Sequence, residues 1–327
     1  MDRELIVSPS PNIRGGDSTQ SLMRDVLIAL APAFLLSVWV YGKYVLFVMS
    51  VSVASCLLFE YLITRFMLKR KSTLDDLSAV VTGVLLAFNL PSTLPLWMVA
   101  MGALVAIGVG KMSFGGLGRN PFNPALVGRV FLLISFPMAM TSFPVPAGTI
   151  DTFSGATPLA IAKEGIKAGM PMNEIMTGIS WKNYLIGVKA GSLGEIAALP
   201  LLFGFLYLLY RKVITWHIPI SVLGAMALFT GIFWAIDPEH CMNPVFHLMT
   251  GGAILGAVFM ATDYVTSPMA FKGMVVFGIG IGLITVLIRL WGTYPEGISF
   301  AILIMNAAVP LIDKYMKPSR YGDRKTV

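Results

Sequence analysis

Long apolar runs, separated by short polar intervals, make up most of this 327-residue chain. A helix that crosses a lipid bilayer needs about 20 consecutive residues that are predominantly apolar. The pattern predicts an all-α polytopic membrane protein with about ten transmembrane segments, several of them short or broken. The predicted segments are 23–40, 44–67, 77–90, 94–110, 123–136, 192–210, 216–236, 244–261, 273–290 and 298–312.

Two polar intervals are not expected to cross the membrane, and they define the organisation of the chain. The first is a basic turn at 69–76, and the second is a long loop at 137–191. We therefore predict an N-terminal segment at 1–22, a first membrane half at 23–136, the loop at 137–191, a second membrane half at 192–312 and a tail at 313–327. Within the first half, Glu60 and Arg65 are expected to pair or to extend to the membrane surface.

Two short apolar runs, 82–91 and 250–268, resemble each other. Each begins with Thr-Gly and ends in polar residues with proline, and the two run in opposite directions in the predicted topology. Paired broken segments of opposite direction indicate an inverted repeat with a site between them. Chance is the competing explanation, because Gly and Pro are frequent in membrane helices. Asp263 is the only carboxylate in either run and is a candidate for an ion path.

Composition and charge support a membrane protein and suggest its orientation. Charged residues make up 13% of the chain, whereas soluble domains have about 25%. If both termini are cytoplasmic, 18 of the 24 lysines and arginines fall on the cytoplasmic side. This bias predicts an extracytoplasmic loop at 137–191. The net charge of +7 is then explained by cytoplasmic loops and lipid headgroups, without a nucleic acid. The two cysteines do not indicate a metal site.

The loop contains a helix start, at which Thr157 is the candidate N-cap. Pro158 suits the first helical position, because its missing N–H would have no partner there. The pattern predicts a short helix at 158–168. Ala160 stands three residues after the cap, which excludes a capping box and leaves the Thr157 hydroxyl without an obvious local partner. An ordinary capped helix is the simplest interpretation of these residues alone.

The pattern formed by Asp151, Ser154, Gly155, Ala156 and Thr157 resembles a known modification sequence. At such sequences a flavin transferase joins FMN to threonine through a phosphoester. They occur in subunits of the Rnf ferredoxin:NAD oxidoreductase and of the sodium-translocating NADH:quinone reductase. The glycine-rich stretch 115–124 and the ten-segment plan also look like the family that contains the D subunit of the Rnf complex. The resemblance implies covalent FMN on Thr157, with Asp151, Ser154, Gly155 and Ala156 as the recognition sequence.

The resemblance also implies a function. It is that of an electron-transfer subunit in a bacterial or archaeal cytoplasmic membrane, coupling electron flow between ferredoxin and NAD to Na⁺ or H⁺ translocation. The implied partners are the other subunits of the complex, a second FMN-bearing subunit among them, the flavin transferase and membrane lipid. A second, non-covalent flavin stays open. The alternative is a small-solute channel or transporter of the urea-transporter type, which shares the inverted repeat and needs no flavin.

Overall fold

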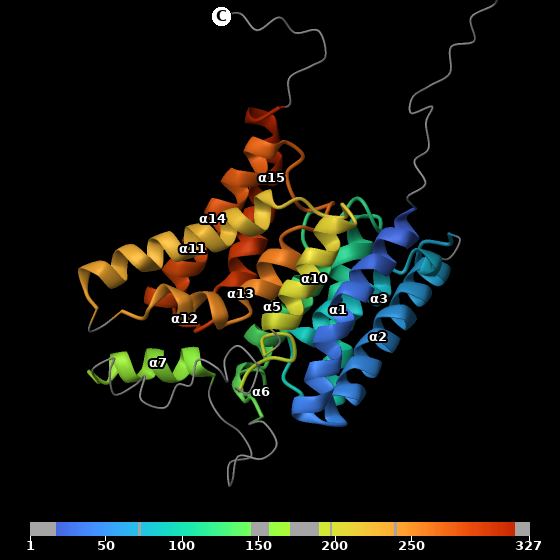
Figure 1. Ribbon diagram of the computed structural model, residues 1–327. Coiled ribbons are helices and arrows are strands. Elements are labelled where there is room, and N and C mark those ends of the chain that lie inside the picture. The colour runs from blue at the N-terminus through green and yellow to red at the C-terminus, as the bar shows by residue number, and fades with distance from the viewer. Residues whose placement is uncertain are drawn as a thin grey trace, which may run out of the picture.

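The structure is a computed structural model that describes residues 18–70, 73–144, 157–170, 190–196, 198–238 and 241–317. Over these ranges the chain forms helices and no β-strand (Figure 1). The predicted all-α class is confirmed.

Six helices of the described residues are long and apolar enough to cross a membrane. In two of them the α-helix continues into a π-helix, a form found mostly at functional sites. The six are α1 (Thr19–Tyr41), α2 (Tyr44–Leu62) with η1 (Ile63–Met67), α4 (Leu96–Val105) with η3 (Ala106–Lys111) and η4 (Met112–Phe114), α11 (His217–Ile236), α14 (Phe271–Trp291) and α15 (Ile298–Tyr315). The chain is therefore a multi-pass membrane protein.

The other four predicted segments are also helical, but each is short. Three are single apolar helices: α3 (Ser78–Phe88), α5 (Pro124–Ser135) and α10 (Ala198–Tyr210). The fourth is broken into α12 (Pro244–Met249), α13 (Ala253–Leu255) and the π-helix η5 (Gly256–Met260). Helices of this length do not span a bilayer of about 30 Å by themselves. The expected short and broken segments are therefore present.

Three helices begin with a polar residue followed by proline. Asn123 caps α5, Asn243 caps α12, and Thr157 caps α7 (Pro158–Lys167). In each case the side-chain oxygen accepts a backbone N–H of the first turn, and the proline occupies a position that needs no donor. The predicted helix at 158–168 is confirmed, with its end one residue earlier.

The first five membrane segments and the last five repeat the same packing. Helix α2 packs against α3 and α4, and α11 packs against α12 and α14. Helix α4 then packs against α5, as α14 does against α15. In Figure 1, α1 and α10 run in opposite directions. The α1–α10 and α5–α15 contacts join the two halves. This arrangement is the predicted inverted repeat.

Small residues allow close helix contacts within each half. A Cβ added to Gly83 on α3 would lie 2.8 Å from the Cα of Val53 on α2, closer than two carbons can approach. The Ser52 hydroxyl donates to the Gly83 carbonyl oxygen at 2.7 Å. Glycine at such contacts brings membrane helices together without an apolar driving force between them. The contact holds α3 close against α2.

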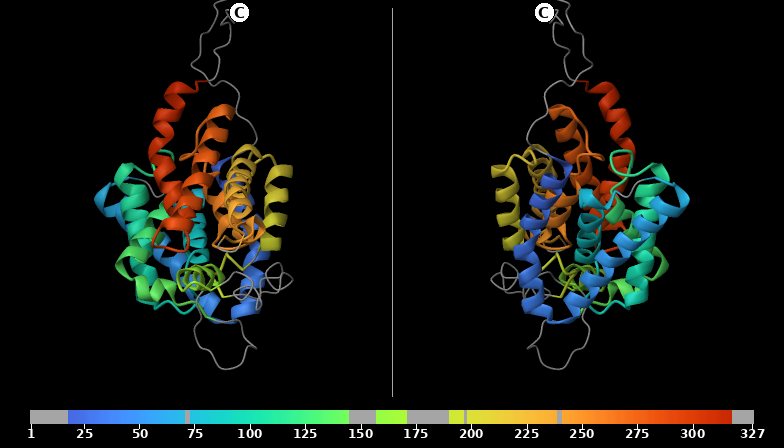
Figure 2. Two further views of the ribbon diagram at one scale, coloured as in Figure 1. Left: turned by 90° about the vertical axis from the view of Figure 1, so that its left-hand side faces the viewer. Right: turned by 90° about the vertical axis from the view of Figure 1, so that its right-hand side faces the viewer.

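Both described ends of the chain lie at the same end of the helix bundle. The start of α1 and the end of α15 both point toward this end, whereas α7 runs across the opposite end, near α6 (Pro137–Thr141) (Figures 1 and 2). The described residues nearest the two termini therefore lie at the end of the bundle opposite α7. Which end faces the cytoplasm remains a prediction.

Candidate functional site

Thr157 is buried at the N-terminus of α7, with 2% of its surface exposed. Its Oγ1 accepts the backbone N–H of Ala160 at 3.2 Å. The expectation that this hydroxyl has no obvious local partner was wrong, because a cap bond from one side chain does not need the reciprocal bond of a capping box. The other predicted recognition residues, Asp151, Ser154, Gly155 and Ala156, lie outside the described residues.

Apolar packing holds α7 against the broken helix of the second half. Leu159 and Ala162 are buried against Met242 and Phe246, in a cluster separate from the main core. Because this cluster lies within the first two turns after Thr157, it fixes the position of the start of α7 relative to α12.

A lysine fixes the other contact of α7. Lys163 Nζ donates to the carbonyl oxygens of Gly292 at 2.5 Å and Tyr294 at 3.0 Å, and it approaches that of Ile288 at 3.4 Å. These carbonyls lie at or just after the end of α14, where a positive charge is favoured. Partial burial, with the neighbouring Lys167, lowers the pKa of Lys163 from its ordinary value. Thr157 is therefore presented on a helix that is anchored at two places.

A cavity of about 400 Å³ lies beside Thr157, and we call it the Thr157 cavity. Three loop or helix segments meet α7 around it. Its lining includes Arg129, Leu133, Met140, Thr141, Ser142, Phe143, Thr157, Ala160, Glu164, Tyr294, Pro295 and Glu296. Ligand pockets in proteins range from about 300 to 1,000 Å³. The cavity is therefore within the size range of a ligand site, and its lining combines aromatic and polar side chains.

A buried ion pair forms one wall of the Thr157 cavity. The guanidinium of Arg129 on α5 donates to the Glu296 carboxylate and to the Ser299 hydroxyl at the start of α15. Both charged residues are almost fully buried. Because neither charge has access to bulk water, the pair ties α5 to α15 and sets a fixed polar wall facing Thr157.

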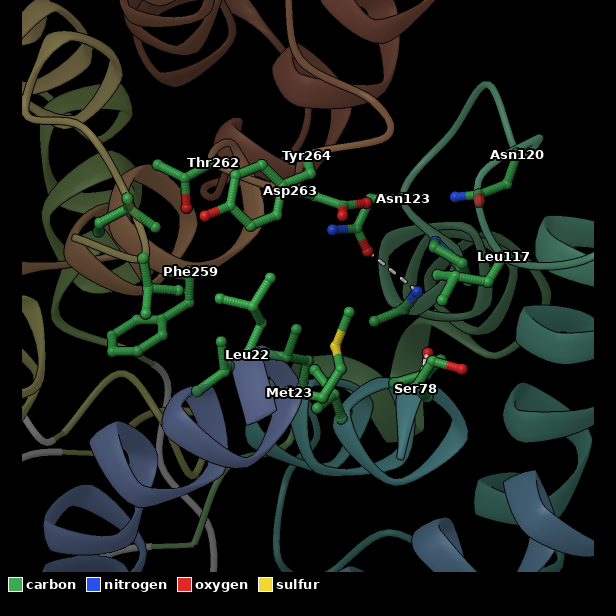
Figure 3. A pocket seen from close by; sticks show the side chains of 18 of the residues that line it. Leu22, Met23, Ser78, Leu117, Asn120, Asn123, Phe259, Thr262, Asp263 and Tyr264 are labelled. Carbon is green, nitrogen blue, oxygen red and sulfur yellow. Dashed lines mark hydrogen bonds between the residues drawn. The ribbon is translucent and has the colours of Figure 1, made fainter. Parts of the chain in front are cut away.

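A second cavity, of about 90 Å³, lies between the two repeats; we call it the central cavity (Figure 3). Thr82 and Leu85 of α3 line it together with Val258 and Phe259 of η5. Near it, Asn89 Nδ2 lies 3.7 Å from Met260 Sδ. The prediction that the runs 82–91 and 250–268 approach each other is confirmed. Their depth in the membrane remains a prediction.

Asp263 lines the central cavity, as do Asn120 and Asn123 of the glycine-rich stretch (Figure 3). The Thr266 hydroxyl donates to Asp263 Oδ2 at 3.3 Å. No lysine or arginine of the described chain forms a salt bridge with this carboxylate. A half-buried carboxylate in this setting, among amide and hydroxyl oxygens, is a suitable ligand for a small cation.

Glu60 has a different partner from the one that the sequence predicts. Glu60 does not pair with Arg65: its Oε2 accepts from Lys111 Nζ at 2.6 Å, and its Oε1 accepts from Thr73 at 2.7 Å. Lys111 also donates to the Ser78 hydroxyl at 2.6 Å, and Lys111 and Ser78 line the central cavity. Arg65 is close to Glu60 in sequence, but the fold brings Lys111 closer in space. The two residues are 51 positions apart, so no local pattern of the sequence pairs them.

The break between α12 and α13 is stabilised by two charged side chains from distant segments. Arg289 donates to the carbonyl oxygens of His247 at 2.5 Å and Thr250 at 2.8 Å. Glu195 Oε1 accepts the N–H of Gly251 at 2.5 Å. Unpaired backbone groups are costly inside a membrane. The side chains of Arg289 and Glu195 therefore satisfy backbone groups that the break leaves without helical partners.

Comparison with known proteins points to a single family. The sequence model described as the NQR2, RnfD, RnfE family matches residues 6–322. The chain is 46% identical over 322 residues to the D subunit of the Na⁺-translocating ferredoxin:NAD⁺ oxidoreductase complex of Acetobacterium woodii, covering 98% of this chain and 96% of that one. It is 40% identical, with the same coverage, to the proton-translocating counterpart of Clostridium ljungdahlii. It is 38% identical to the D subunit of an ion-translocating oxidoreductase complex of Escherichia coli, covering 98% and 99% of the two chains.

Proposed function

The chain belongs to the NQR2, RnfD, RnfE family, and from this membership we propose that it is an electron-transfer subunit of an ion-translocating ferredoxin:NAD oxidoreductase, carrying covalent FMN on Thr157. One observation of the structure carries the proposal. The Thr157 side chain stands at a helix start, on the wall of a cavity of about 400 Å³. The partners are the other subunits of the complex, including a second FMN-bearing subunit, and the flavin transferase.

The residues around Thr157 suit a phosphoester. Its Oγ1 would carry the phosphoryl group, and the first turn of α7 places the positive end of its dipole there. Tyr294 and Phe143 line the cavity that would hold the ring system. FMN would supply one- and two-electron redox chemistry. The protein fixes its position through the Lys163 anchor and excludes water from the buried hydroxyl.

We expect the flavin on one proteolytic peptide. Trypsin cleaves after lysine and arginine, and the sequence has neither between Arg129 and Lys163. Peptide 130–163 of the purified chain should therefore carry the added mass of FMN, with fragment ions placing it on Thr157. If this peptide is recovered only unmodified, the flavin assignment is overturned, and a flavin-free solute channel of the same inverted-repeat architecture becomes the better interpretation.

For the central cavity we propose an ion and not a second flavin. Its volume of about 90 Å³ is well below the roughly 300 Å³ at which ligand pockets begin. The cavity is therefore closer in size to an ion or water site than to a site for the second, non-covalent flavin that the resemblance left open. Asp263 offers a carboxylate, and Asn120 Oδ1 is buried without a hydrogen-bond partner among the described residues. Such oxygens are suitable ligands for Na⁺, and the carboxylate can also carry H⁺.

Replacing Asp263 with asparagine is expected to slow coupled ion uptake about tenfold, which corresponds to about 1.4 kcal/mol in the transport barrier. The substitution removes the charge and keeps the shape. Ion uptake into vesicles, driven by electron transfer through the complex, measures the effect, and the flavin content of Thr157 should not change. Asp75→Asn is the matched control, because Asp75 lies in the turn η2 (Leu74–Asp76) outside the cavity lining. Normal uptake in Asp263→Asn would remove Asp263 from the path.

We propose that both termini are cytoplasmic and that the α7 end of the bundle is extracytoplasmic. In a Cys241→Ser background, an impermeant thiol reagent added to intact cells should label Met170→Cys and not Tyr315→Cys. Both positions are exposed and lie at opposite ends of the bundle. After cell lysis both should react. Labelling of Tyr315→Cys alone in intact cells would reverse the orientation.

A further inference from the structure

A third cavity, of about 200 Å³, lies between α7 and the last turns of α11 and α14, and we call it the basic cavity. Three cations line it: Lys163 and Lys167 of α7, and Arg289 of α14. No carboxylate is among its described lining residues. The other lining residues are Ile166, Phe233, Cys241, Met242, Leu290 and Trp291. A cavity with this lining has a positive electrostatic potential, and its other walls are mostly apolar.

Two of the three cations donate their hydrogen bonds to neutral groups. Arg289 and Lys163 donate hydrogen bonds to neutral backbone carbonyl oxygens. Arg289 is almost fully buried, and its Nε has no hydrogen-bond partner within the described ranges. Glu195 and Glu296 act electrostatically on Arg289 and offset part of its charge, but neither carboxylate lines the cavity. Burial and the adjacent Lys167 lower the pKa of Lys163, as expected where positive charges crowd together.

The basic cavity lies where a lipid headgroup would be. Trp291 ends α14, and its ring meets that of Phe233 edge to face, with centroids 5.2 Å apart. Trp291 is 63% exposed, and Trp234 next to Phe233 is also exposed. Exposed tryptophans at helix ends mark the membrane–water interface. Beyond them, Ile232, Ile236 and Leu287 present exposed apolar side chains on α11 and α14, on which acyl chains could lie.

We propose that the basic cavity binds one anionic phospholipid through its phosphate. The phosphate accepts hydrogen bonds from Lys167 Nζ. Lys163 and Arg289 attract it electrostatically, while both keep their bonds to carbonyl oxygens. Because two of the cations belong to α7 and the third to α14, the bound lipid also holds α7 against the membrane segments. The site does not depend on a flavin at Thr157, so this proposal and the proposed function can fail separately.

Native mass spectrometry of the detergent-purified complex tests the proposal. After delipidation, phosphatidylglycerol added back should bind to this subunit about tenfold more tightly than phosphatidylcholine. Lys167→Gln should weaken phosphatidylglycerol binding about fivefold, since one interfacial cation is lost. Lys43→Gln is the matched control: Lys43 is an exposed lysine at the same end of the bundle, outside the cavity. Arg289 variants are avoided because Arg289 also supports the broken helix.

A second readout locates the bound lipid. Cys241 lines the basic cavity, and the other cysteine, Cys56, is fully buried. Phosphatidylglycerol should therefore slow alkylation of Cys241, followed by peptide mass spectrometry, in the wild type and much less in Lys167→Gln. Equal binding of the two lipids, or unchanged binding in Lys167→Gln, would overturn the proposal. Inorganic phosphate that protects Cys241 and displaces the lipid would also overturn it, by assigning the site to free phosphate.

Discussion

Replacing Thr157 with alanine is expected to abolish covalent flavin on this chain and to stop ferredoxin-dependent NAD reduction by the assembled complex. Alanine has no oxygen to carry a phosphoester, so the fluorescence of the denatured chain on a gel under ultraviolet light should fall to background. Loss of the cap bond to Ala160 should cost about 1 kcal/mol of stability. That is small beside the packing of Leu159 and Ala162, which keeps α7 in place.

Two further variants separate attachment from structure. Thr157→Ser keeps both the hydroxyl and the cap, and it should retain part of the flavin. Thr141→Ala is the matched control: Thr141 lines the same cavity, and its hydroxyl donates to the Pro137 carbonyl oxygen at 2.8 Å. It should keep full fluorescence. A fluorescent Thr157→Ala chain would show that the flavin is joined elsewhere.

Replacing Lys111 with methionine is expected to destabilise the protein by about 3–5 kcal/mol, the usual cost of removing one partner of a buried ion pair. Glu60 is 0% exposed and Lys111 is 1% exposed. Without Lys111, the Glu60 carboxylate would keep only the Thr73 hydroxyl as a hydrogen-bond donor among the described residues. Thermal unfolding of the purified complex, followed by loss of monodisperse protein, measures the change.

The double variant Glu60→Gln, Lys111→Met identifies the cause. It removes both charges at similar volume, and it should recover most of the lost stability. Lys314→Met on the exposed face of α15 is the control and should change stability by less than about 0.5 kcal/mol. If Lys111→Met is as stable as the wild type, the pair contributes little and Lys111 is held by other contacts.

Local patterns of the sequence were enough to predict where the membrane helices lie and where α7 begins. Each predicted apolar run contains a helix, and Thr157 and Pro158 begin α7 as predicted. The two Thr-Gly runs were enough to predict an inverted repeat with both runs at one cavity. These features depend on hydrophobic length and on backbone preferences of nearby residues, which a sequence displays directly.

The buried polar contacts were decided only by the tertiary structure. Glu60 and Lys111 are 51 residues apart, Arg129 and Glu296 are 167 apart, and Glu195 reaches Gly251 across 56. Which charges meet depends on how helices rotate and cross, and hydrophobic periodicity carries too little information to set those angles. The sequence therefore determined the elements and the position of Thr157 on a helix start. Packing decided which side chains surround it, because a charge inside a membrane is stable only beside the partner that the fold brings to it.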